Sequence, residues 1–244
     1  MSLEWEGPAV VIGARPLGET GLVVTLLTEA MGRHAGLVRG GQSRAHSPTW
    51  QPGNLVEARW VARLADQLGN LTGEVVHAGA ALAMDDALAL GVLTAACAVA
   101  EGALPERQPH PRSFHGLVRL MVALARDAGG GPAALVRWEA VLLAELGYGL
   151  DLAACAVTGA TEGLAWVSPR TGRAVSAAAG AAYADRLLPL PAFLLGEGDG
   201  SPAEWRDGLR LTGHFLERDA FGHLHRPLPG ARHLLQERVD AMVV

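Results

Sequence analysis

The sequence predicts an α+β fold in which a small five-stranded β-barrel precedes a mainly α-helical region. Three observations support this prediction. The chain has 244 residues and a hydrophobic content of 50%, enough to bury a sizeable core. Short β-type runs separated by Gly and Pro fill the first 80 residues, and the hydrophobic period then changes from two to about 3.6. We therefore expect a barrel domain over residues 1–79 and a helical domain over residues 80–244, with an irregular insertion around residues 150–183.

Five β-type runs define the N-terminal part: Ala9–Ala14, Leu22–Thr28, Ala35–Arg39, Leu55–Leu64 and Leu71–His77. The fourth run alternates, which places Trp60 on the core face and Arg59 and Arg63 on the solvent face. Gly32 is expected to supply the positive φ of a turn between the second and third strands. Barrel closure would leave no free sheet edge. An oligonucleotide-binding (OB) barrel is the leading candidate, and an SH3-like barrel fits the strand count nearly as well.

Helical periodicity follows residue 80. The predicted helices are Ala80–Glu101, Ser113–Asp127, Pro132–Leu146 and Pro202–Arg218. Ser201 and Glu204 form a predicted capping box at the start of the last of these helices. Asp85 and Asp86 interrupt the most apolar run, and its charge-free part is too short to span a membrane. We expect a buried helix there.

The composition indicates which cellular compartment and which kinds of chemistry to expect. Two cysteines, Cys97 and Cys155, suit a reducing cytoplasm, and the N-terminus shows no export-signal pattern. No common catalytic motif is present and the chain has no Lys, so we expect a protein that is not an enzyme. The histidines at positions 214, 223, 225 and 233 follow no recognised zinc spacing, so solvated surface residues are the simpler interpretation.

A basic stretch stands out in a chain of formal net charge −5. No Asp or Glu occurs from Ala30 to Val56, so arginines there could neutralise phosphates without competing carboxylates. A solvated flexible loop is the alternative. The candidate nucleic-acid-binding residues are Arg33, Arg39, Arg44, His46, Trp50, Arg59 and Arg63. Trp50 would either stack on a base or pack beneath the Pro52-Gly53 turn.

Eight segments, in order along nearly the whole chain, resemble the bacterial RecO recombination mediators. They include LLTEAMG (residues 26–32), QPG (51–53), ELGYGL (145–150), DLAACAVTG (151–159) and RLLPLP (186–191). The resemblance implies an OB barrel, a helical C-terminal part and a non-catalytic role in loading the recombinase onto DNA coated with single-stranded DNA-binding protein. The implied partners are single-stranded DNA, RecR and the acidic tail of the coating protein. No cofactor is implied.

Two consequences of the resemblance concern particular residues. Some members carry a four-cysteine zinc site near Cys155, but this chain has Thr158 at the next ligand position, so no metal is expected. The helical pattern predicts Arg137 beside an apolar surface from which Arg119 and Arg126 also emerge, and an acidic peptide with an apolar end suits such a place. Solvation of helix faces is the alternative.

Two functions of different classes remain open from the sequence. One is a mediator that binds and anneals single strands, located in the cytoplasm at the nucleoid. The other is a protein-interaction adaptor with little DNA affinity, because residues 1–80 contain six Arg against seven acidic residues. A hydrolase that uses the C-terminal histidines is a third, residual possibility.

Overall fold

A computed structural model describes residues 3–64 and 66–243. Five strands form a closed barrel in the order β1-β2-β3-β5-β4. They are β1 Leu3–Leu17, β2 Gly21–Thr28, β3 Gly32–Val38, β4 Leu55–Ala62 and β5 Asn70–His77. The barrel closes through a parallel pair between Leu37 of β3 and Asn70 of β5. This five-stranded order is that of an OB barrel, so the OB prediction is confirmed.

Strand β1 is longer than the predicted run because it pairs on both sides. Its first half pairs with β4 and its second half with β2, with a bulge between Val11 and Gly13. The segment from Ala9 to Ile12 is buried on both faces. Ala9 and Val11 belong to the barrel core, whereas Val10 and Ile12 belong to the core of the helical part. The barrel therefore lies directly on the helices through β1.

The turn between β2 and β3 contains Gly32 in the expected left-handed conformation, with φ of +65°. A Cβ atom at this position would lie 2.0 Å from the carbonyl oxygen of Gln108, in the segment that follows α2. Glycine is required here by conformation and by close packing. This contact joins the barrel to the helical region.

Seven α-helices are described: α1 Gly79–Ala83, α2 Ala87–Ala103, α3 Pro111–Arg126, α4 Gly131–Glu145, α5 Ala177–Gly180, α6 Pro202–Phe215 and α7 Gly230–Ala241. The predicted helix Ala80–Glu101 is thus two helices. Asp86 separates them because it adopts an extended conformation and its carboxylate accepts the first amide hydrogen bonds of α2. The capping box of Ser201 and Glu204 is confirmed. A π-helical turn, Leu216–Phe221, continues α6.

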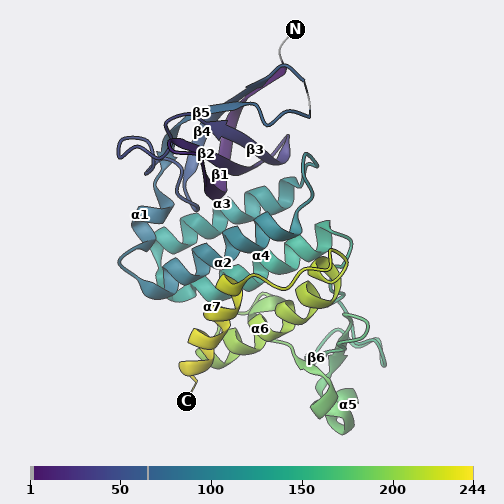
Figure 1. Cartoon of the computed structure of the whole chain (residues 1–244). Helices are drawn as coiled ribbons and strands as arrows, with labels where there is room; N and C mark the ends of the chain where they lie inside the picture. Colours follow the sequence, from purple (N-terminus) through teal and green to yellow (C-terminus); the bar gives the residue numbers. More distant parts are fainter. Residues whose placement is uncertain (1–2, 65, 244) are drawn as a thin grey trace.

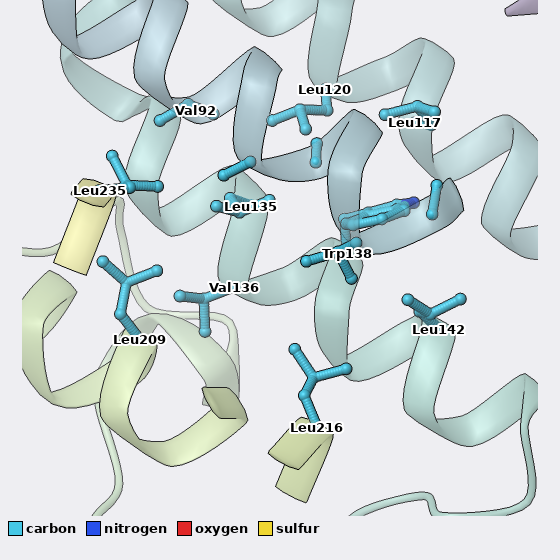
Figure 2. Packing of buried hydrophobic residues seen from close by; sticks show 14 of the residues in the cluster. Val92, Leu117, Leu120, Leu135, Val136, Trp138, Leu142, Leu209, Leu216 and Leu235 are labelled. Atoms are coloured by element: carbon cyan, nitrogen blue, oxygen red, sulfur yellow. The ribbon is translucent and has the colours of Figure 1, made fainter. Parts of the chain in front are cut away.

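Helices α2, α3 and α4 form the layer beneath the barrel, and α6 and α7 pack on its other side (Figure 1). Buried apolar side chains from all five helices and from the π-helical turn meet in one core, shown in Figure 2 around Leu135 and Trp138 of α4. No helix in the described part of the chain has the length and apolar character needed to cross a membrane.

The segment expected to be irregular, residues 150–183, contains two strands of a small antiparallel sheet, and the third strand follows this segment. The strands are β6 Leu164–Val167, β7 Ala174–Ser176 and β8 Leu188–Pro189. They are too short to show a periodic pattern, and glycines at positive φ interrupt the segment, Gly163 just before β6 and Gly172 between β6 and β7. This sheet lies far from the barrel (Figure 1).

Candidate nucleic-acid interface

An open hollow of about 400 Å³ lies between the end of β3, the loop that follows β3 (residues 39–50) and the start of β5. We call it the loop hollow. Leu37, Leu71 and an edge of Trp50 give it apolar walls, and Arg39, His46, Asn70 and Thr72 supply polar groups. The two strands meet here because β3 and β5 close the barrel. OB folds bind ligands on the face of their second and third strands, and the loop hollow adjoins that face through β3.

Arg39 lies on the ridge between the loop hollow and a second depression, the Arg63 hollow, which Arg63 and Gln67 also line. The Nε–H of Arg39 donates to Oδ1 of Asn70 at 3.0 Å. This bond orients the guanidinium group and leaves its two terminal nitrogens for an anion. Arg39 is thus held in place by a neighbour that is not an acid.

The loop over the hollow is tied to the barrel by hydrogen bonds. Gln42 donates through Nε2 to the carbonyl oxygens of Gly18 and Gly21, at 3.1 and 2.8 Å. Asn54, which is buried, donates to the carbonyl oxygens of Pro48 and Thr49 at 2.8 and 3.2 Å. The other side of the same amide, Oδ1, accepts from the backbone N–H of Ala80 at 3.2 Å. These hydrogen bonds favour a loop with a fixed conformation, which covers the hollow as a roof, over the alternative of a flexible solvated loop.

Charges divide the outer face of the barrel into two areas. Within the described residues, no carboxylate lies within 4.0 Å of Arg39, Arg44 or Arg63, and all three are exposed. On the far side of Thr72 and Gly73 is an acidic hollow that includes Glu57 and Glu74, which are cross-strand partners in register. Arg39, Arg44, His46 and Arg63 therefore form a basic surface beside an acidic one.

Arg59 belongs to the acidic area. Its guanidinium group pairs with Glu4 at 2.8 Å and approaches Glu6 at 4.0 Å. The prediction that Arg59 faces solvent is correct, but its inclusion in the basic surface is wrong. The pairing of β1 with β4 brings the two glutamates beside it, and this contact between distant parts of the chain is invisible in the sequence.

Arg33 is also separate from the basic surface. It lies six residues from Arg39 at the opposite end of β3, about 20 Å away at strand spacing. Its side chain is largely buried, 3.5 Å from Glu106, and its carbonyl oxygen accepts from the N–H of Arg107. The expected grouping of Arg33 with Arg39 and Arg44 is therefore corrected: Arg33 packs where the barrel meets the helical region.

Trp50 has 3% of its surface exposed and packs in the barrel core. Its ring lies against Gly73, where a Cβ atom would be 3.1 Å from it. Neither ring face is free for a base, so packing is the correct alternative and stacking is wrong. Trp50 contributes only an edge to the loop hollow.

Sequence reasoning missed three polar residues of this region. Asn70 and Thr72 become visible as site residues only once β5 is placed beside β3. Arg107 follows α2, at a φ of +58°, and donates to the carbonyl oxygen of Gln67 at 3.2 Å. The only signal in the sequence was the position of Asn70 just before an alternating run, which is equally typical of a turn.

Of the three arginines predicted to bind a partner, Arg119 and Arg126 are exposed on α3, with the half-exposed Val122 between them. Arg137 of α4 is engaged within the chain. It pairs with Asp199 at 3.0 Å, and its guanidinium carbon lies 5.3 Å from the ring centre of Phe193. The expectation for Arg137 is therefore corrected, because its charge holds the segment between β8 and α6 against α4.

Within the part of the chain that the structure describes, no three His, Cys, Asp or Glu side chains lie where they could hold a metal ion. His214 contacts the carbonyl oxygen of Pro169 at 3.0 Å. The Cys155 sulfur accepts from the N–H of Ser176 at 3.3 Å. Hydrogen bonds from the side chains of Thr158 and Ser176 lower the pKa of Cys155 to about 6.

The barrel order and its basic, hollowed face define a protein of the OB-barrel class. Two family models match the chain: Recombination protein O N terminal over residues 1–78 and Recombination protein O C terminal over residues 84–227. The chain belongs to the RecO family.

Curated relatives agree with this assignment. A "DNA repair protein RecO" of Gluconacetobacter diazotrophicus is 60% identical over 245 residues, which cover 98% of this chain and 96% of the relative. Proteins of the same name from Granulibacter bethesdensis and Acidiphilium cryptum are 57% and 55% identical. Those alignments cover 98% and 97% of this chain and 97% and 96% of the relatives. The chain is thus similar to DNA repair proteins over nearly its whole length.

Proposed function

We propose that this protein is a DNA repair and recombination mediator, without catalytic activity, that binds and anneals single-stranded DNA at the nucleoid. It helps to load the recombinase onto DNA coated with single-stranded DNA-binding protein. One observation carries the DNA-binding part: Arg39, Arg44 and Arg63 are exposed beside the ligand face of an OB barrel with no carboxylate within 4.0 Å among the described residues. The names of the relatives support the repair role.

DNA binding at this surface is mainly electrostatic. A phosphate neutralised by one of these arginines releases counterions, and each contact contributes about −0.7 to the log-log salt slope on single strands. Three contacts give a slope of about −2. Arg59 is already neutralised by Glu4, so it contributes little.

The test is fluorescence anisotropy of a labelled single-stranded oligonucleotide at several salt concentrations. The triple variant Arg39→Ala/Arg44→Ala/Arg63→Ala is expected to lose most of the affinity and the salt dependence. Arg59→Ala is the matched control on the same face and keeps both. Wild-type affinity and slope in the triple variant would refute this assignment, and annealing of complementary labelled strands is followed in the same samples.

The proposed partners are RecR and the acidic tail of single-stranded DNA-binding protein. For the tail, the exposed row of Arg119, Val122 and Arg126 on α3 offers two charges around an apolar side chain. Calorimetry with the tail peptide should show weaker binding to Arg119→Ala/Arg126→Ala. Arg112→Ala, an exposed arginine in the first turn of α3, is the control. Equal binding of the peptide by wild type and both variants would show that the tail binds at another surface.

A protein-interaction adaptor with little DNA affinity is the second candidate. The acidic area formed by Glu4, Glu6, Glu57 and Glu74 favours it, because these carboxylates repel phosphates close to the basic surface. Undetectable oligonucleotide binding at low salt, together with retained binding of RecR, would select the adaptor.

A further inference from the structure

The loop hollow has the size and chemistry of a small-molecule site. Phosphate binding by the basic surface alone does not require such a hollow. The volume of the loop hollow, about 400 Å³, lies in the range of small-molecule sites, roughly 300 to 1,000 Å³. Leu37, Leu71 and the edge of Trp50 line it with apolar surface, and phosphates gain nothing from such surface. A ligand that is both anionic and flat would contact the apolar walls and the polar groups of the hollow, including Arg39, at the same time.

Unused hydrogen-bonding groups face this space. Oδ1 of Asn70 accepts from Arg39, which leaves the two N–H groups of its amide. Within residues 3–64 and 66–243, no hydrogen bond of the Thr72 hydroxyl or of the Asn70 amide nitrogen is formed. His46 uses Nδ1 in its contact with Ser43 at 3.2 Å and keeps Nε2. The edge of a nucleobase, which carries both donors and acceptors, matches such a set.

Charge fixes the direction in which a bound strand leaves the hollow. The acidic hollow shares Thr72 and Gly73 with the loop hollow and contains Glu6, Glu57 and Glu74. A phosphate chain is repelled on that side. On the other side, Arg39 on the ridge and Arg63 beyond it attract phosphates. The strand would therefore run from the loop hollow over Arg39 towards Arg63.

From these observations we infer that the loop hollow holds one unpaired nucleobase of a single strand whose adjacent phosphate is bound by Arg39. The inference rests on the proposed function and adds to it a base-binding subsite. Bases in a duplex are paired and stacked, so a duplex binds this surface through its phosphates only. Sequence preference is weak, since every base has a flat apolar face and an edge with acceptors.

The first experiment uses the wild-type protein and two oligonucleotides of equal length and charge, one normal and one with every base removed. The abasic oligonucleotide is expected to bind about tenfold more weakly or worse, as for loss of a base contact. Its salt slope should be unchanged, because the phosphates remain. Equal affinities would overturn the base subsite and leave the proposed function intact, whereas no binding of either oligonucleotide would refute the proposed function itself.

A variant that fills the hollow gives an independent test. Thr72 is exposed on β5, so Thr72→Trp places a ring in the space without entering the barrel core. This variant should bind the normal oligonucleotide as weakly as wild type binds the abasic one, and should bind the abasic oligonucleotide and duplex DNA as wild type does. Val76→Trp is the matched control, because Val76 is exposed on the same strand and lines neither hollow.

Thermal unfolding verifies that both tryptophan variants are folded before their affinities are compared. A Thr72→Trp protein with wild-type stability and wild-type affinity for the normal oligonucleotide would overturn the inference. So would an equal loss of affinity for the normal and abasic oligonucleotides, because that result indicates a disturbed Arg39 and not a blocked base.

Discussion

Arg232 of α7 and Glu139 of α4 form a bidentate ion pair inside the helical core. The Nε–Oε1 distance is 2.6 Å and the Nη2–Oε2 distance is 3.1 Å, and the two side chains are 1% and 0% exposed. Arg232 also donates to the carbonyl oxygen of Leu209 at 2.7 Å, so the pair joins α4, α6 and α7. Two charges are thus removed from water at the point where three helices meet.

We predict that Arg232→Met destabilises the protein by about 3 to 5 kcal/mol, because Glu139 is left as an unpaired buried charge. Urea unfolding measures the change. The double variant Arg232→Met/Glu139→Leu should recover most of the loss, since an apolar pair replaces both charges. Arg210→Ala, which breaks the exposed pair with Asp240, is the control and should cost less than about 1 kcal/mol. A double variant less stable than the single one would contradict this account.

We predict that Asn54→Ala weakens both folding and DNA binding. The substitution leaves the partly buried carbonyl oxygens of Pro48 and Thr49 and the buried N–H of Ala80 without their partner, which costs about 1 to 3 kcal/mol. The roof of the loop hollow would loosen, so affinity for single strands falls while the salt slope stays the same. Urea unfolding and anisotropy check the two parts. Gln51→Ala, at an exposed position next to the same loop, should change neither quantity.

The stability of the barrel should fall in weak acid because of His34. Its buried ring lies edge-on to Trp5 and Trp60, with centroid distances of 5.5 and 4.6 Å. Burial, and then the charge of Arg107, lower its pKa from 6.5 to about 4, while the charge of Glu106 acts in the opposite direction.

The direction of the pH effect follows from these pKa values. Between pH 6.5 and 4 the unfolded chain binds the His34 proton and the folded chain does not. As the pH is lowered through this range, the free energy of unfolding therefore falls by up to about 1.4 kcal/mol for each pH unit. Above pH 6.5 the contribution is complete. Urea unfolding at several pH values should show a smaller slope for His34→Phe, whereas His46→Phe, at an exposed ring, should keep the wild-type slope. Equal slopes in all three proteins would exclude His34 as the source.

Purified protein should contain less than one zinc per chain. The Cys155 sulfur is occupied by hydrogen bonds from Thr158 and Ser176, and one thiolate cannot hold a structural zinc ion. Elemental analysis of wild type and Cys155→Ser should give the same low value. Stoichiometric zinc in wild type that disappears in the variant would show that Cys155 is a zinc ligand and would contradict this prediction.

Local signals in the sequence predicted the elements well. The alternation around Trp60, the positive φ of Gly32 and the capping box of Ser201 all lie within a few residues of the features they specify. The break at Asp86 was missed because the apolar run continues on both sides of it. Each of these outcomes depends on neighbours along the chain.

The candidate site depends on contacts between distant segments, which a single sequence does not contain. Arg39 and Asn70 meet through the closure of the barrel, and Arg59 is neutralised by Glu4 through the pairing of β1 with β4. The acid-free stretch includes the loop after β3, which lines the loop hollow. It could not show that Arg33 lies at the other end of that strand, or that Arg137 is held by Asp199.

The double-sided burial of β1 has a consequence for how the molecule can be divided. Val10, Ile12 and Leu27 of the barrel belong to the same apolar core as Leu93 and Ala96 of α2. A fragment cut after residue 79 would present these three side chains to water and lose the Gly32–Gln108 contact. We therefore expect barrel and helices to unfold together as a single cooperative unit, so that a truncated barrel would be a poor substitute for the intact chain in any binding assay.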